Sequence, residues 1–161
     1  MYAWNHRAAM AMREYGARRL TVPVELNYRE ILEAGLSGEL LVYGYLPMMV
    51  SAQCVQKTTR GCMGRTELLY LRDRKGKEFP TVNQCRFCYN TIYNSSPLSL
   101  LGLSDKVDAI GPEALRLNFT IEDKKTAENV LDAFYREFVE KLPAESPVQD
   151  FTRGHFRRGV E

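Results

Sequence analysis

The residues of this sequence best suited to chemistry are four cysteines, Cys54, Cys62, Cys85 and Cys88, spaced C-x7-C-x22-C-x2-C. Cys85 and Cys88 form a chelating pair, because two thiolates separated by two residues can turn onto one ion. Four thiolates suit either tetrahedral zinc or an iron–sulfur cluster, and the spacing does not choose between them. We therefore predict that the four cysteines hold a metal centre.

Two other interpretations of these cysteines remain open. A free cysteine is among the most often buried residue types, so each thiol could simply fill an apolar interior. A Cys-x-x-Cys pair can also do redox chemistry, although such a pair usually begins a helix after a strand. Four cysteines within thirty-five positions of a basic segment favour the metal.

The charge around the cysteines is basic, although the whole chain carries only +2. Residues 51–90 hold eight Lys or Arg against three Asp or Glu. Such a cluster can attract an anion or a nucleic acid, and it can equally be the solvated face of a hairpin. The candidate anion-binding residues are Arg60, Arg65, Arg72, Arg74 and Lys75.

No catalytic residue can be assigned from the remaining sequence. No Ser/His/Asp order, Gly-rich phosphate loop or His-x-x-x-His pair is present. His6 lies near an expected helix start, and His155 lies in a basic tail. Glu25 follows an expected strand, where it either acts as a catalytic carboxylate of the barrel type or caps the next helix.

The N-terminal elements predict a βαβ arrangement. The pattern predicts strands over residues 1–4, residues 19–24 and Leu40-Leu41-Val42-Tyr43. It predicts helices over residues 5–16 and 27–34. Asn5 can cap the first helix, and Gly35 ends the second. This alternation of strands and helices predicts an α/β fold with a parallel sheet.

The rhythm breaks between residues 51 and 90, where no helical period is visible. Residues 68–71 and 77–80 flank Asp73-Arg74-Lys75-Gly76 and predict a hairpin. Residues 115–119 indicate another strand. Thr120 and Asp123 form a T-x-x-D capping box for a helix through Glu140. Its expected apolar face consists of Ala127, Val130, Leu131, Phe134, Phe138 and Leu142.

Composition suggests one globular domain over residues 1–161, with residues 51–90 as a cysteine-bearing, basic hairpin segment inside it. Hydrophobic residues make up 45% and charged residues 26% of the chain. No stretch is long and apolar enough to span a membrane, and no secretory pattern is visible, so we expect a cytoplasmic protein with reduced thiols. So few strands would leave an open sheet edge, which predicts a fragment of a larger domain or a homodimer that covers the edge.

Several segments together resemble the collagenase-like peptidase family of unassigned catalytic type (peptidase family U thirty-two). The matching segments span nearly the whole chain. They are residues 43–50 (YGYLPMMV) with Cys54, residues 71–76 (LRDRKG) with Phe79-Pro80, Cys88 with Ile92-Tyr93-Asn94, and the tail 151–160 (FTRGHFRRGV).

The resemblance implies that this chain is the C-terminal part of a (β/α) barrel whose remainder is its natural partner. Members of the family were named as proteases, and others act in hydroxylation of RNA or of ubiquinone precursors. Those enzymes carry a four-iron, four-sulfur cluster on four cysteines, which here would be the four named above. The parent is then an enzyme acting on RNA or peptide, and the isolated chain is expected to be inactive.

A binding module is the alternative function: a zinc-stabilised unit that presents its basic hairpin to RNA without catalysis. A third alternative is that the isolated chain holds no metal, either because oxygen destroys the cluster or because assembly needs the rest of the barrel.

Overall fold

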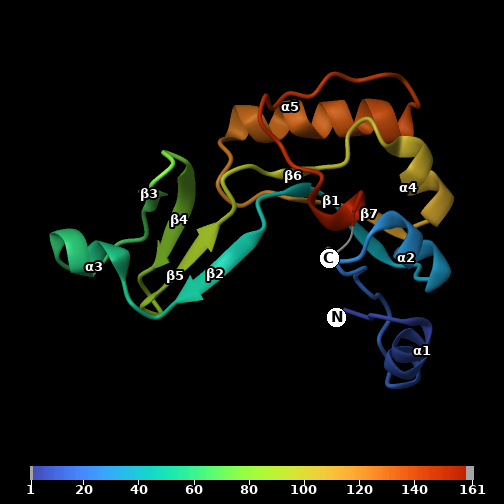
Figure 1. The fold of residues 1–161 in the computed structure, drawn as a ribbon, viewed down its shortest axis with the longest axis horizontal. Helices are drawn as coiled ribbons and strands as arrows, with labels where there is room; N and C mark the ends of the chain where they lie inside the picture. The colour runs from blue at the N-terminus through green and yellow to red at the C-terminus, as the bar shows by residue number, and fades with distance from the viewer. Residues whose placement is uncertain (1, 159–161) are drawn as a thin grey trace. The chain divides into compact units, whose positions relative to one another are not determined.

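The fold is known from a computed structural model that describes residues 2–158 (Figure 1). Met1 of the first expected strand, and Gly159 and Val160 of the tail motif, lie outside the described residues. The chain divides into two compact units. Residues 2–44 and 98–158 belong to one, here called the α/β unit, and Tyr45–Pro97 form the other, here called the cysteine unit. The cysteine-bearing segment expected over residues 51–90 lies inside the second unit, and the single domain over residues 1–161 stays a prediction.

The α/β unit is built on a three-stranded sheet with strand order β6-β1-β7. β1 (Glu39–Gly44) pairs in parallel with β7 (Ala114–Asn118) and antiparallel with β6 (Leu98–Ser99). Two isolated parallel bridges, from Tyr2 to Thr21 and from Thr21 to Glu39, extend this sheet. The predicted combination of helices and strands is confirmed, but the sheet is mixed, because β6 pairs antiparallel and only the β1–β7 pair is parallel.

Side-chain caps begin the first two helices of this unit, as the sequence predicts for Asn5, whereas the second helix is capped by Asn27 and not by Glu25. The Asn5 side chain accepts a hydrogen bond from the Ala8 N–H at the start of α1 (His6–Glu14). α2 (Tyr28–Glu33) has a full capping box, in which Asn27 and Glu30 each bond the other's backbone N–H. Such caps satisfy N–H groups that have no partner inside the helix.

The core of the α/β unit lies between the sheet and α5 (Lys124–Phe134). The Tyr43 ring of β1 lies 5.9 Å from the Phe134 ring and 5.7 Å from the Phe119 ring, between centroids. Val42 and Val130 are fully buried. A π-helix, Tyr135–Val139, continues α5, and α4 (Ser104–Ile110) and a 3₁₀ turn (Gly154–Phe156) complete the unit.

The cysteine unit is a four-stranded antiparallel sheet with strand order β2-β5-β4-β3. Its strands are β2 (Pro47–Ser51), β3 (Leu68–Arg72), β4 (Glu78–Gln84) and β5 (Tyr89–Tyr93). The predicted hairpin around residues 73–76 is confirmed as the β3–β4 turn, in which the Asp73 carboxylate accepts from the Lys75 and Lys77 N–H groups. A short helix, α3 (Val55–Arg60), connects β2 to β3.

Four sequence predictions about these elements are wrong. Residues 2–4 and 19–24 form no strand, because only Tyr2 and Thr21 make isolated bridges there and Pro23 lacks an N–H for a ladder. The segment 51–90 does contain a helix, α3. Asp123, rather than Thr120, is the N-cap of α5, and its carboxylate accepts from the Thr126 N–H.

The long helix also departs from its predicted face and end. The α-helical part stops at Phe134, and the π-helix follows. Val130, Phe134 and Phe138 are buried as predicted, whereas Leu131 and Leu142 are about half exposed.

Neither sheet of the described residues closes on itself, so a barrel is not seen in this chain. The described part of the chain has five α-helices, and none of its helices combines the length and the apolar character needed to cross a membrane.

Candidate metal centre

All four cysteines line one pocket of about 300 Å³ in the cysteine unit. Its wall also includes Lys57, Asn83 and Tyr89. Cys54 and Cys85 are half-buried, Cys62 and Cys88 are exposed, and none of the four forms a disulfide. The structure therefore brings together residues that are up to thirty-four positions apart in the sequence.

The β4–β5 hairpin supplies two of the thiols. Gln84 and Tyr89 are paired in register, so residues 85–88 form its four-residue loop. The Phe87 N–H donates to the Gln84 carbonyl at 3.0 Å, which makes the loop a tight turn. Cys88 ends it in the left-handed region with φ 54°, which is uncommon for a residue with a Cβ. The short turn holds Cys85 and Cys88 on the same pocket.

The two ends of α3 supply the other two thiols. Cys54 is the N-cap of α3, and its Sγ accepts from the Lys57 N–H at 3.4 Å. The Thr58 hydroxyl adds a bond to the Cys54 carbonyl at 3.0 Å. Cys62 follows Gly61, whose φ of 86° turns the chain at the end of the helix.

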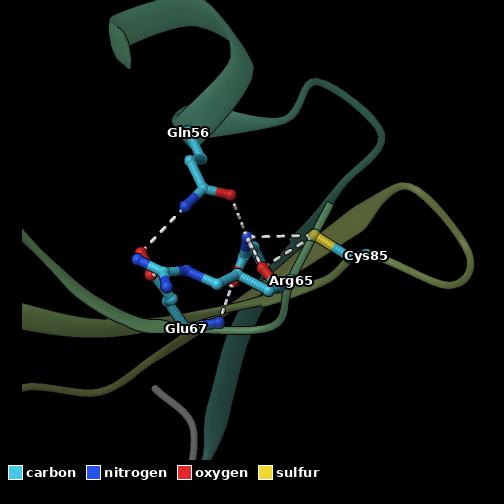
Figure 2. A network of polar contacts seen from close by, with 5 residues as sticks. Gln56, Arg65, Glu67 and Cys85 are labelled. Atoms are coloured by element: carbon cyan, nitrogen blue, oxygen red, sulfur yellow. Dashed lines mark hydrogen bonds and ion pairs between the residues drawn. The ribbon is translucent and has the colours of Figure 1, made fainter. Parts of the chain in front are cut away.

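A buried polar network centred on Asn83 connects α3 to the hairpin. Its Nδ2 group donates to the Gln56 Oε1 at 2.7 Å, to the Arg65 carbonyl at 3.1 Å and to the Cys85 Sγ at 3.3 Å. Figure 2 shows this network with two further hydrogen bonds. The Gln56 Nε2 group donates to the Glu67 carboxylate at 2.8 Å, and the Cys85 thiol donates to the Arg65 carbonyl at 2.9 Å. The Asn83 Oδ1 accepts from the Glu67 N–H.

A second buried asparagine holds the segment before Cys54. Asn90 is the register partner of Asn83 in the β4–β5 pair. Its Nδ2 group donates to the Gln53 carbonyl at 2.6 Å and to the Ser51 carbonyl at 3.3 Å, while its Oδ1 accepts from the Val55 N–H at 3.4 Å. The two asparagines therefore fix both cysteine-bearing segments to one pair of strands.

The electrostatics of the pocket disfavour a free thiolate. Partial burial raises the pKa of the Cys85 thiol, and the nearby Cys54, Cys62, Cys88 and Glu67 raise this pKa further by repulsion. The other three sulfurs are thus close enough to Cys85 to disfavour its thiolate, and a cation would relieve that repulsion.

The sulfurs do not yet form a coordination sphere. Within residues 2–158, no group of three or more His, Cys, Asp or Glu side chains is arranged so that it could hold a metal ion. Cys85 donates to a carbonyl, and Cys54 accepts from a backbone N–H. Metal ligation would therefore require thiol side chains to turn from these partners toward the pocket.

The candidate anion-binding residues are dispersed over the cysteine unit. Arg60 lies at the end of α3, and Arg74 and Lys75 lie at the exposed β3–β4 turn. Arg65 pairs with Glu67 at 2.5 Å, and Arg72 pairs with Glu78 at 2.6 Å. The Glu78 partner raises the pKa of Arg72 through a hydrogen bond and its charge. Two of the five candidate charges are therefore already balanced by carboxylates.

Sequence reasoning missed the polar residues that position the thiols: Gln56, Asn83 and Asn90. Their burial is the signal, since each is at most 2% exposed, and burial is not visible in a single sequence. The sequence offered one weak signal. Asparagine is depleted in strands, so Asn83 and Asn90, which lie on either side of the Cys85–Cys88 pair in a non-helical segment, are unusual there.

Compared with known proteins, the chain matches no family model, no curated protein and no solved structure. The resemblance to the collagenase-like peptidase family therefore stays a prediction.

Proposed function

We propose that the cysteine unit binds a four-thiolate metal centre through Cys54, Cys62, Cys85 and Cys88. The observation that carries this proposal is that all four thiols line one pocket, although two come from the ends of a helix and two from a hairpin turn. Four cysteines that merely filled an interior would be buried apart from one another, whereas here two are exposed and two are half-buried.

The interior of the cysteine unit gives a second, independent reason for a metal. Ile92 is its single large buried aliphatic residue. The buried residues of this unit are Gln56, Pro80, Thr81, Asn83, Asn90, Ile92, Ser96 and Pro97. A small unit without an apolar core usually needs a disulfide or a metal to stay folded. Because the thiols form no disulfide, metal binding would supply this stability.

The size of the pocket favours a cluster over a single ion. A zinc ion binds thiolates at about 2.3 Å, so its four sulfurs lie only about 3.8 Å apart. The pocket that these cysteines help to line holds about 300 Å³, which is far more than a single ion occupies. The cysteine side chains would have to move inward less to bind a group of several atoms than to bind one ion. An iron–sulfur cluster is therefore the favoured occupant, and zinc is the alternative.

The chain would then be the metal-carrying, C-terminal part of a larger (β/α) barrel enzyme. The parallel β1–β7 pairing supports this idea, because parallel strands are the building units of such barrels. The resemblance to the collagenase-like peptidase family adds that the parent acts as a peptidase or as an iron–sulfur-dependent hydroxylase on RNA or peptide. The rest of the barrel, or a second copy of the chain, would cover the open sheet edges.

The alternative is a zinc-stabilised RNA-binding module. It depends on the basic residues of the β3–β4 turn, and the ion pairs of Arg65 and Arg72 weaken it. It predicts a colourless zinc protein whose affinity for RNA falls steeply with salt.

The test is anaerobic purification of the full chain, followed by iron, sulfide and zinc analysis and an absorption spectrum. Each Cys→Ser change is expected to lower metal content, because each removes one ligand. Ala52→Ser is the matched control, since Ala52 lines the same pocket and gains a hydroxyl without the loss of a thiol.

Brown protein with iron and sulfide in equal amounts would support the cluster, and one zinc per chain would support the alternative. Metal retained by at least two of the four single Cys→Ser variants at the wild-type level would refute the four-thiolate assignment.

A further inference from the structure

The Asn83 side-chain amide has fewer donor hydrogens than there are acceptors around it. Its Nδ2 group has two hydrogens, yet three acceptors lie within reach: Gln56 Oε1, the Arg65 carbonyl and Cys85 Sγ. The orientation of the amide is fixed, because its Oδ1 accepts from the Glu67 backbone N–H, which can only donate. The Nδ2 group must therefore point toward the cysteine side of the network.

The protonated Cys85 thiol resolves this shortage for the metal-free chain. Its hydrogen goes to the Arg65 carbonyl at 2.9 Å, so this carbonyl is satisfied without Asn83 (Figure 2). A sulfur that ligates a metal has lost its hydrogen and can only accept. The carbonyl of Arg65 then needs a donor, and so does the sulfur, and Asn83 faces both.

We propose that Asn83 is the positioning residue of the metal centre: it donates an N–H to the metal-bound Cys85 sulfur and thereby couples ligation to the buried network of α3. The proposal rests on the four-thiolate function above. Partners that bond the ligands of a metal fix their orientation and tune the metal. Hydrogen bonds to cysteine sulfur also shift the reduction potential of a cluster.

Asn90 provides the matched control. Asn90 is the register partner of Asn83 and is equally buried. Both ends of its side-chain amide also bond the backbone: Nδ2 donates to the Gln53 carbonyl, and Oδ1 accepts from the Val55 N–H. Its side chain bonds backbone groups of Ser51, Gln53 and Val55, and none of these partner atoms is a sulfur. A change at Asn90 therefore tests the loss of a buried amide without the loss of an N–H to sulfur.

The experiment uses the full chain loaded with Cd²⁺, a probe that binds thiolates and has an NMR-active isotope. In the wild type, a side-chain amide hydrogen of Asn83 should show scalar coupling to cadmium through the sulfur, and the Asn90 amide should show none. Asn83→Asp should lower Cd²⁺ affinity by about tenfold or more. Asn90→Asp should also lower the affinity, because Asn90 holds the Cys54 segment, but it should keep the Asn83 coupling.

The outcomes separate this proposal from the proposed function. If Cd²⁺ binds the cysteines and Asn83 shows no coupling, Asn83 does not bond the ligand and the inference is wrong, even if Asn83→Asp fails to fold. If the wild-type chain binds no Cd²⁺ through its cysteines, the proposed function fails and this inference fails with it. Coupling at Asn83 in the wild type, kept in Asn90→Asp, together with the affinity loss in Asn83→Asp supports both.

Discussion

Replacement of Asn90 by leucine should unfasten the segment that carries Cys54. Leucine has the same branching and the same number of side-chain heavy atoms but can form none of the three hydrogen bonds that Asn90 makes. One of these is short, at 2.6 Å, and two are long, at 3.3 and 3.4 Å. With a net value of about 0.5–1.5 kcal/mol for each bond, the cysteine unit should lose about 2–3 kcal/mol.

The assay must report on the cysteine unit alone. The chain has one tryptophan, Trp4, which lies in the α/β unit, so tryptophan fluorescence would follow the other unit. Amide hydrogen exchange read by NMR resolves the difference, with the amide of Thr58 in α3 as the probe, because this N–H donates to the Cys54 carbonyl. A loss of about 2–3 kcal/mol should speed its exchange roughly 30- to 150-fold where exchange requires the unit to open.

Asn94→Leu is the control for this prediction. Asn94 follows β5, is half-buried, and its side chain accepts a local hydrogen bond from the Ser95 N–H at 2.8 Å. Exchange at Thr58 should change little in that variant. A change smaller than about threefold in Asn90→Leu, or an equal change in both variants, would show that Asn90 does not hold the Cys54 segment.

Four further outcomes are expected. The Thr126 hydrogen bonds hold the pKa of Asp123 below its ordinary value. The ionised carboxylate therefore stabilises the fold above the ordinary aspartate pKa, and this stabilisation is lost as the pH falls through the lowered pKa. Asp123→Ala should accordingly weaken the fall of melting temperature with decreasing pH at the acid end. Asn27→Ala should cost about 1 kcal/mol in a urea titration, through loss of the α2 cap. Phe134→Ala should cost about 3–5 kcal/mol, because this ring is 4% exposed and packs on Tyr43. A chelator added to metal-loaded protein should speed amide exchange in Tyr45–Pro97 and leave the α/β unit unchanged.

Local signals in the sequence predicted the elements that local contacts stabilise. Asn5 predicted the start of α1, because a cap acts over three residues. Asp73 and Gly76 predicted the β3–β4 turn for the same reason. The strand expected over residues 19–24 did not form, because Pro23 cannot extend the pairing beyond the isolated bridges of Thr21.

The sequence predicted the four candidate ligands but not the buried polar residues that position them. The Cys-x-x-Cys spacing pointed to a shared pocket, and the structure places all four thiols around one. α3 was missed because its six residues show no apolar period; its buried residue is the polar Gln56, and its cap is a cysteine. Asn83 bonds Gln56 across twenty-seven positions, and no local rule predicts a contact at that separation.

The π-helix after α5 makes the chain sensitive to length at that point. The Glu140 N–H donates to the Tyr135 carbonyl, five residues back, so the turn contains one residue more than an α-helical turn would. This extra residue places Glu137 and Phe138, which are neighbours in sequence, both in the interior, where both Glu137 carboxylate oxygens accept from the Gly102 N–H at 2.8 Å. Deletion of a single residue between 135 and 139 should restore regular winding, rotate Glu137 away from Gly102 and detach the following segment, whereas most substitutions at the exposed Tyr135 or Val139 should be tolerated.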